Sequence, residues 1–442
     1  MITVKAYVAL LPYFLLTCGV FPFSRDRRND EEIMFQRKAR GRQHSVRKGG
    51  KKVSGTYIVR LADDTTSFYV KGLAAKHASK MRDIIKKSIA SGQMMQSNIT
   101  QVVKRGHIFT SSIKGFTLTG IPDELAQSLV NMTGVISVEQ DEFFSGVDQW
   151  HESSESLSMY RNQIASSHSG RALWETDTQG NSSCPQMVPW GVKRVGGPIL
   201  SNPNPNGRVF IIDTGISPVA DLNIDKNLSI DFVNDGGSSP AWNDRNGHGT
   251  HVAGTVAAID NCIDVVGVVP GATVVAVRVL DSSGGGTWSA VIKGIDYVAA
   301  TAKKGDVANL SFTGPILESA DSAVINAAKQ GIKFALAAGN YDDDSNNYSP
   351  ARLSTENVYT VSAFDPYEYL CSWSNYGNPP ITYSGPGEDV WSLNYQGGIE
   401  MRSGTSMASP HIAGLLLAGN IAVDGYIQGD KDSVPDAIAC WK

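Results

Sequence analysis

The sequence predicts an α/β domain built on a parallel sheet, preceded by a smaller α+β domain. In the second half of the chain, continuous apolar runs of strand length alternate with segments of helical periodicity, which is typical of a parallel sheet covered by helices on both faces. Before this half, shorter strand and helix patterns are followed by a stretch rich in Ser, Asn and Gln, which marks a linker.

Composition and charge limit the class of protein. The 442 residues carry 39 Lys+Arg and 43 Asp+Glu, a formal charge of -4, and 41% are hydrophobic. This composition excludes a mainly disordered or fibrous chain. The charge is unevenly placed, because residues 25–52 hold 11 basic and 4 acidic side chains whereas residues 186–442 hold 15 and 26. Two segments of opposite character suggest a chain that is processed.

Residues 1–24 have the features of a secretory signal peptide. Lys5 precedes a mostly apolar run from Ala6 to Phe23, and the basic tract from Arg25 follows at once. A signal anchor and a buried N-terminal helix are the alternatives. No other stretch approaches transmembrane length, so we expect a secreted protein whose remaining chain is soluble.

The tract 25–52 is polar and predicts a disordered basic linker. Affinity for nucleic acid or membranes would suit its charge, but we favour a solvated, protease-sensitive tract and expect no nucleic-acid partner.

Once a signal containing Cys18 is removed, four cysteines remain, which suggests two disulfides in one of three connectivities. Six sequons are compatible with an exported glycoprotein, at Asn98, Asn131, Asn181, Asn227, Asn309 and Asn347.

Residues 53–145 are predicted to form the α+β domain, and 146–185 the linker. Strands are expected at Gly55–Leu61, Phe116–Thr119 and Val135–Val138, and helices within Phe68–Gln93 and Pro122–Val130. Residues 186–442 form the α/β domain. Its strands are expected at Val209–Ile212, Thr273–Val279, Val307–Leu310 and Phe334–Ala337, with helices at Thr250–Ala258, Trp288–Ala302 and Ala320–Gln330.

Functional residues of such a sheet collect at strand carboxyl ends and helix N-termini, where two candidates stand. Asp213 directly follows the strand Val209–Ile212, where an acid can be buried and orient a histidine. Asp-Thr-Gly is also a common turn and occurs in aspartic proteases. His248 and His251 lie in Gly-His-Gly-Thr-His at the entry to a helix. Two structural histidines or a metal pair are the alternatives, although their spacing of three differs from HxxxH and HExxH zinc motifs.

Two further candidates follow. Ser406 begins an apolar helix, so its hydroxyl lies in the positive end of the helix dipole near backbone N–H groups, although serines at helix starts are usually N-caps. Asn340 ends the strand that includes Phe334–Ala337, and its amide could donate to an oxyanion. An isolated Asn there would otherwise be interpreted as a turn residue. The chain order Asp, His, Asn, Ser separates this set from other triad orders.

Together these motifs resemble the subtilase family (peptidase family S8). Asp-Thr-Gly, Gly-His-Gly-Thr-His-Val-Ala-Gly, Ala-Ala-Gly-Asn and Gly-Thr-Ser-Met-Ala-Ser-Pro-His stand in the family's order across residues 186–442. The resemblance implies a three-layer subtilisin-like domain and a serine endopeptidase. It makes Ser406 the nucleophile, His248 the general base and Asp213 its orienting acid. Asn340 and the Ser406 N–H would form the oxyanion hole, and His251 would be structural.

The resemblance also implies where a peptide substrate binds. It would lie as an added strand between two enzyme segments. The matching residues are Ser283, Gly284, Gly285, Gly286 and Trp288 on one side, and Ser311, Phe312, Thr313, Ala338 and Gly339 on the other. Thr313 replaces a glycine usual in the family, so we expect a narrower primary pocket. The acidic run Asp342–Asp344 either attracts a basic P1 residue, the one on the acyl side of the scissile bond, or forms a solvated loop.

A structural Ca²⁺ site is a further implication of the resemblance. Its ligands would be the side chains of Gln186, Asp221 and Asn261 and the carbonyls of Ile259, Ile263 and Val265. If Gln186 and Asn261 bind one ion, Cys184 and Cys262 lie near it. We therefore predict the disulfides Cys184–Cys262 and Cys371–Cys440.

Residues 53–145 resemble the family's inhibitory prosegment, through Tyr57-Ile-Val-Arg, Gly115-Phe-Thr-Leu and Ile136-Ser-Val-Glu-Gln-Asp141. This implies a zymogen whose own prosegment inhibits it until a bond between Phe144 and Cys184 is cut. We expect a monomeric enzyme of broad specificity. A catalytically silent binding protein of the same fold and a membrane-tethered processing protease are the alternatives.

Overall fold

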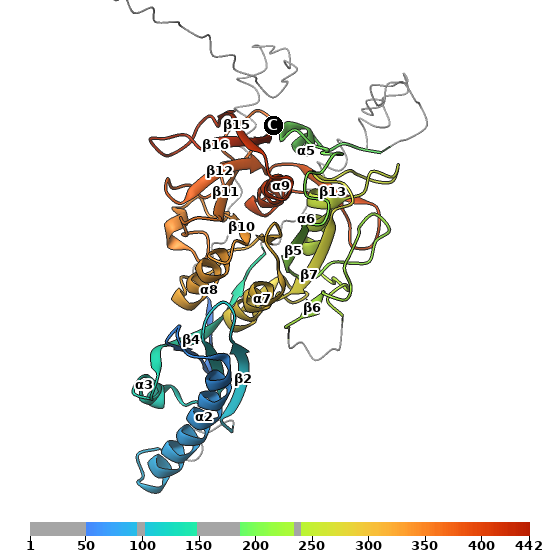
Figure 1. The fold of residues 1–442 in the computed structure, drawn as a ribbon. Helices are drawn as coiled ribbons and strands as arrows, with labels where there is room; N and C mark the ends of the chain where they lie inside the picture. The colour runs from blue at the N-terminus through green and yellow to red at the C-terminus, as the bar shows by residue number, and fades with distance from the viewer. Residues whose placement is uncertain (1–49, 95–101, 148–185, 234–239) are drawn as a thin grey trace, which may run out of the picture.

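The computed structural model describes residues 50–94, 102–147, 186–233 and 240–442. The predicted signal peptide, almost all of the basic linker and the linker 146–185 from residue 148 onward lie outside these residues. Figure 1 shows an N-terminal unit, residues 50–147, packed against the α7 and α8 side of a larger C-terminal domain, residues 186–442. Among the described helices, none has the length and apolarity needed to span a bilayer.

The N-terminal unit is a small antiparallel sheet covered by a long helix. Strands run in the order β2-β3-β1-β4, and the C-terminal domain adds β8 beside β4. The elements are β1 Lys51–Leu61, α2 Ser67–Ala90, β2 Lys104–Phe109, β3 Gly115–Thr119, the 3₁₀ turn η2 Asp123–Leu125, α3 Gln127–Val130 and β4 Val135–Ser145. One face of α2 packs on the sheet through residues such as Val70, Ala74 and Met81, which recur at helical spacing.

Three details of this unit differ from the sequence prediction. Lys51 and Lys52, assigned to the disordered linker, begin β1 and pair with Phe143 and Glu142 of β4. Strand β2 was not predicted, because its first three residues are all exposed and show no alternation. Strand β4 continues to Ser145 instead of ending at Val138, since its charged residues are matched by partners across the sheet and in the C-terminal domain.

The C-terminal domain is the predicted three-layer α/β structure. Its nine-stranded sheet has the order β15-β16-β12-β11-β10-β9-β5-β7-β6, and every pairing from β16 to β6 is parallel. The strands are β5 Arg208–Asp213, β6 Ile230–Asp231, β7 Thr273–Arg278, β8 Gly285–Thr287, β9 Val307–Leu310, β10 Lys333–Ala337, β11 Val358–Phe364, β12 Ile381–Pro386, the hairpin β13 Val390–Leu393 and β14 Ile399–Arg402, β15 Ile421–Tyr426 and β16 Ala437–Trp441.

Helices cover both faces of this sheet (Figure 1). They are α5 Trp190–Arg194, α6 His248–Ala257, α7 Trp288–Thr301, α8 Glu318–Ala328 and α9 Thr405–Ala418, with a 3₁₀ turn η3 at Ser345–Asn347. Along β5, Val209 and Ile211 join the core cluster that includes α6 and α9, while Phe210 and Ile212 join the one that includes α7 and α8. This alternation explains why the strand is apolar throughout.

The cysteines require a correction. Cys440 in β16 is disulfide-bonded, whereas Cys371 is a buried thiol within the apolar core around α9, so the predicted pair Cys371–Cys440 is wrong. A buried cysteine packs as a small hydrophobic residue, which sequence spacing does not reveal. Cys262 is also disulfide-bonded. Cys184 lies outside the described residues, so the pair Cys184–Cys262 stays a prediction.

The sequons differ in accessibility. Asn131, Asn227 and Asn347 are exposed, while Asn98 and Asn181 lie outside the described residues. Asn309 is fully buried in β9, where its amide donates to the Ser311 hydroxyl at 2.8 Å. A glycan on Asn309 is therefore incompatible with this fold.

Candidate active site

The acid and the histidine meet where β5 ends and α6 begins. Asp213 is the last residue of β5 and is fully buried, and His248 is the first residue of α6. His248 Nδ1 lies 2.8 Å from Asp213 Oδ1 and 3.0 Å from Oδ2. Asp213 Oδ1 also accepts from the N–H of Thr214 at 2.7 Å. The carboxylate is thus fixed, and it in turn fixes the plane of the imidazole.

The glycines that flank His248 are required by space and by backbone conformation. Gly247 has φ +97°, and a Cβ there would lie 2.7 Å from the ring of Tyr395. A Cβ on Gly249 would lie 2.1 Å from the carbonyl oxygen of Gly215. The Gly-His-Gly sequence therefore lets the start of α6 approach the end of β5, which brings His248 to Asp213.

Asp244 supports this turn and was missed by the sequence analysis. Its Oδ1 accepts from the N–H groups of Asn246 and Gly247 at 3.0 and 2.9 Å, and its Oδ2 accepts from the Thr250 N–H at 3.0 Å. Asp244 is buried and ties the turn to the first turn of α6. The pattern of an Asp three residues before a Gly-His-Gly helix start could have indicated it.

His251 is separate from this pair. It is fully buried, and its Nε2 lies 3.1 Å from the carbonyl oxygen of Val390. Burial, reinforced by the positive charge of Arg402, lowers the pKa of His251 well below its usual value. The ring is therefore neutral, and its surroundings are those of a structural histidine.

The serine lies in the first turn of α9, where that helix faces the ends of β9 and β10. Ser406 Oγ donates to the carbonyl oxygen of Ser311 at 2.7 Å, and the Ser311 hydroxyl donates to the Ser406 carbonyl at 2.8 Å. Residue Gly404 directly before the helix has φ +155°. These two reciprocal bonds hold the start of α9 against the segment that follows β9.

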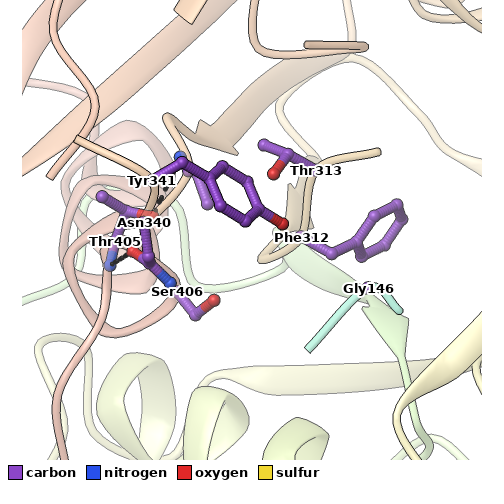
Figure 2. Close-up of a pocket in the computed structure, with 9 residues that line it drawn as sticks. Gly146, Phe312, Thr313, Asn340, Tyr341, Thr405 and Ser406 are labelled. Carbon is purple, nitrogen blue, oxygen red and sulfur yellow. Dashed lines mark hydrogen bonds between the residues drawn. The ribbon is translucent and has the colours of Figure 1, made fainter. Parts of the chain in front are cut away.

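Asn340 lies beside Ser406, as Figure 2 shows. Its Oδ1 accepts from both the N–H and the hydroxyl of Thr405, each at 2.8 Å. The Thr405 hydroxyl also accepts from the Gly339 N–H at 3.1 Å. Because Oδ1 is used in this way, Nδ2 is the atom of this amide that can donate toward the neighbouring cavity. Asn340 and Ser406 both line that cavity.

One of the two predicted substrate-binding segments lines the same cavity, and the other pairs with the end of the N-terminal unit. Strand β8 pairs with β4 through Phe143↔Thr287, Phe144↔Gly286 and Ser145↔Gly285. The carbonyl oxygen of Gly284 then accepts from the N–H groups of Gly146 and Val147 at 2.9 and 3.0 Å. Phe312, Thr313 and Gly339 line the cavity, together with Gly146. The end of the N-terminal unit thus lies as an extra strand along β8 and reaches the cavity.

The remaining predicted residues have different surroundings. The ring centroid of Phe144 lies 4.4 Å from that of Trp288 and 6.1 Å from that of Phe312. Ser283 instead closes a turn, where its hydroxyl donates to Asp281 at 2.6 Å. Ala338 is buried, and its carbonyl accepts from the Ser345 hydroxyl and the Asn375 amide.

The acidic run 342–344 is engaged in its own loop. Asp342 is paired with Lys431, and Asp344 accepts from the N–H of Asn346 at 2.8 Å. Asp343 accepts from the hydroxyl of Tyr348 at 3.0 Å. These partners favour the solvated-loop interpretation of the run over a rim for basic P1 residues.

Comparison with known proteins identifies the family. The subtilase family model matches residues 206–418. Subtilisin Savinase of Lederbergia lenta is 40% identical over 233 residues, which are 52% of this chain and 82% of that protein. The chain belongs to the subtilase family. Alkaline serine exoprotease A of Vibrio alginolyticus is 35% identical over 310 residues, 70% of this chain. The match covers 52% of the length of that exoprotease. M-protease of Shouchella clausii is 39% identical over 234 residues, and the match covers 59% of its length. This subtilase therefore spans only about half the length of these two relatives.

Proposed function

We propose that this subtilase is a secreted serine endopeptidase made as a zymogen. The observation that carries the proposal is the buried pair of Asp213 and His248 in the same domain as Ser406 and Asn340. Ser406 and Asn340 line a cavity, and the end of the N-terminal unit reaches this cavity. Membership of a family of serine proteases supports the activity. The match to exoprotease A is longer than residues 186–442, so it includes part of the chain before Gln186.

The residues can perform acyl transfer in two steps. Ser406 Oγ, which donates to the Ser311 carbonyl in this structure, rotates about χ1 and gives its proton to His248 Nε2 as the oxygen attacks the peptide carbonyl. Asp213 holds Nδ1–H and stabilises the imidazolium that forms. His248 then protonates the leaving amine. Water hydrolyses the acyl-enzyme by the reverse proton path.

The developing oxyanion requires donors already in place. The Asn340 amide and the Ser406 N–H would supply them, at the positive end of α9. Because Thr405 orients the amide through two hydrogen bonds, little reorganisation is needed as the charge develops.

We infer that the N-terminal unit is the inhibitory prosegment. Besides the β4–β8 pairing, its carboxylates cap two helices of the catalytic domain. Glu139 accepts from the N–H groups of Glu318 and Ser319 at 3.0 and 3.1 Å at the start of α8, and Asp141 accepts from the Ser289 N–H at 3.0 Å at the start of α7. Capping carboxylates stabilise helix N-termini, so these contacts support docking of the two parts.

A third contact strengthens this docking. Asp296 of α7 has its Oδ1 within 2.6–2.9 Å of three successive N–H groups of the N-terminal unit, at Thr110, Ser111 and Ser112. Lys293 donates to the Ile108 carbonyl at 2.7 Å and to Asp296 Oδ2 at 3.0 Å. A buried carboxylate bound by consecutive N–H groups specifies one docked geometry.

We also propose a structural Ca²⁺ site at the predicted loop. The carbonyl oxygens of Ile259, Ile263 and Val265 all converge within 2.6–2.8 Å of one atom, Gln186 Nε2. Asp221 Oδ2 is buried with no hydrogen-bond partner, and burial raises the pKa of this carboxyl to about 7. Asn261 donates to Asp221 Oδ1 at 2.8 Å. Gln186 Oε1 accepts from the N–H groups of Asn261 and Cys262, so this amide would turn its oxygen toward the ion on binding. Convergent carbonyls beside an unsatisfied carboxylate oxygen fit a hard cation, which would neutralise the carboxylate and hold the loop.

The catalytic proposal is tested by Ser406→Ala and by phenylmethylsulfonyl fluoride. We expect the wild-type precursor to cleave itself and to lose activity as the reagent sulfonylates one serine, found by peptide mass mapping at Ser406. The Ser406→Ala precursor should stay intact. Maturation of that variant in a purified system would contradict the role of Ser406, whereas a wild type that neither matures nor is labelled would favour a silent binding protein. Cell fractionation separates a secreted enzyme from a membrane-tethered one.

A further inference from the structure

The direction of the bound segment shows which side chain the cavity receives. Strand β4 runs toward Ser406, with Phe144 and Ser145 paired along β8 and Gly146 at the cavity beside Ser406 and Asn340. A peptide bound like this segment has its acyl side along β8. A Cβ on Gly146 would lie 3.1 Å from Leu280, which does not line the cavity. The cavity next to the nucleophile is therefore left for the side chain of the following residue, the position of Val147 in this chain, which is P1.

One wall of the cavity is closed by Thr313. Its side chain is buried, and its Oγ1 lies 3.3 Å from the position that a Cβ on Gly339 would occupy. The segments 312–313 and 337–340, which flank the cavity, are therefore almost in contact there. The Gly314 N–H donates to the Ser349 carbonyl at 2.9 Å and the Ser349 N–H to the Gly314 carbonyl at 3.1 Å. This backbone pair holds the wall just behind Thr313.

The other wall is Tyr341, which the sequence analysis did not single out. Figure 2 shows its ring crossing from Asn340 toward Phe312 and Thr313, over the space between the two flanking segments. The ring stacks on Tyr348 with centroids 4.8 Å apart and planes 16° apart. The Tyr348 hydroxyl is held by Asp343 at 3.0 Å, so the stack is anchored in the acidic loop.

The space left between these walls is small and carries no acidic group. Thr313 and Gly339 close it on one side and Tyr341 on the other, and none of the residues that line it is acidic. Asp343 binds Tyr348 and Asp342 binds Lys431, so neither carboxylate lines it.

We propose that Thr313 and Tyr341 restrict P1 to small side chains such as Gly, Ala, Ser and Val, and exclude aromatic and long basic ones. This inference rests on the proposed peptidase function and names its substrate class. A side chain larger than the cavity binds only by displacing the Tyr341–Tyr348 stack or the wall behind Thr313, and such displacement reduces kcat/KM. One methylene group in a pocket changes discrimination by roughly 10–200-fold.

The test is a series of peptides that differ only at P1, with Ala, Val, Phe or Lys there and Phe three residues earlier, as Phe144 stands before Val147. Active enzyme is counted by titration with a fluorophosphonate. We expect kcat/KM of the wild type for Ala and Val to exceed that for Phe and Lys by at least tenfold. A wild-type preference for Phe or Lys would overturn the inference while leaving the peptidase function intact. Titration that labels no serine would overturn both.

Variants identify the residues responsible. Thr313→Gly and Tyr341→Gly should each raise the ratio of kcat/KM for Phe to that for Ala at least tenfold. The matched controls Thr355→Gly and Tyr367→Gly change exposed residues of the same types and should leave this ratio unchanged. An unchanged ratio in both wall variants would show that these side chains do not set P1 preference.

Discussion

At the scale of single residues, the site depends on hydrogen bonds from supporting residues that hold each functional side chain in place. Asp213 is fixed by Thr214, and Asn340 by two bonds from Thr405. Thr214 is the neighbour of Asp213 in the chain, whereas Thr405 is 65 positions from Asn340 and is the neighbour of Ser406. Asp-Thr-Gly includes the residue that fixes the acid, and Gly-Thr-Ser includes the residue that orients the amide. Each support therefore lies within one of the motifs, although not always beside the residue that it holds.

Asn340→Leu tests the oxyanion role. We expect kcat to fall roughly 10²–10³-fold with little change in KM, since the amide acts on the transition state more than on the bound substrate. Steady-state kinetics on one peptide measure both constants. Asn420→Leu, an exposed site, is the matched control and should behave as wild type. A loss confined to KM would argue that Asn340 binds the ground state.

At the scale of elements, helix N-termini organise the molecule. Helices α6 and α9 begin at the candidate catalytic residues His248 and Ser406, whereas α7 and α8 begin at carboxylates of the N-terminal unit. The positive starts of α7 and α8 thus serve docking of the N-terminal unit on one side of the sheet.

Glu139→Ala should weaken docking of the N-terminal unit. Loss of a helix cap costs about 1 kcal/mol, so we expect the lag before full activity of the purified precursor to shorten about fivefold. The time course of activity at fixed precursor concentration measures this lag. Glu124→Ala removes an exposed acid of the same unit and should leave the lag unchanged. An equal effect of both variants would indicate general destabilisation instead of lost capping.

The loop 259–265 should respond to calcium. At 100 times its Kd the ion stabilises the folded state by about 2.7 kcal/mol, which is on the order of 5–10 °C in Tm for a domain of this size. Calorimetry of the Ser406→Ala precursor with Ca²⁺ or with EGTA measures the difference. Gln186→Ala should abolish it, whereas Gln396→Ala, which changes an exposed glutamine, should not. A Tm that EGTA leaves unchanged would contradict the site.

At the scale of the whole molecule, one antiparallel sheet joins the two parts, because β8 of the catalytic domain completes the sheet of the N-terminal unit. At the opposite edge, the hairpin of β15 and β16 extends the large sheet through β12. The hairpin is tied to the interior by buried Asp436, which accepts from the Ser362 hydroxyl of β11 at 2.6 Å.

Asp436 makes overall stability depend on pH. Burial, together with the charges of Asp430 and Asp432, raises the pKa of its carboxyl from 3.8 to about 7. The folded state therefore binds this proton more tightly than the unfolded chain, so the free energy of unfolding decreases as pH rises from about 4 to about 7, by up to roughly 4 kcal/mol.

We expect Asp436→Asn, made in the Ser406→Ala precursor, to flatten the fall in Tm between pH 5 and pH 8. Thermal unfolding at a series of pH values measures this slope. Asp83→Asn, at an exposed site, should retain the slope of the parent. Parallel curves for parent and Asp436→Asn would exclude this carboxyl as the cause.

The sequence by itself determined the fold class, the order of the apolar strands and the four motifs of the candidate site. It could do so because burial on both faces of a parallel sheet demands continuous apolar runs. In addition, several supporting residues lie within the motifs themselves: Thr214 beside Asp213, Gly247 and Gly249 beside His248, and Thr405 beside Ser406. Only the tertiary structure placed the Tyr341–Tyr348 stack at the cavity that Thr313 also lines, the pairing of β4 with β8 and the thiol of Cys371 in the core. These features depend on which distant segments pack together, and local periodicity carries no record of that.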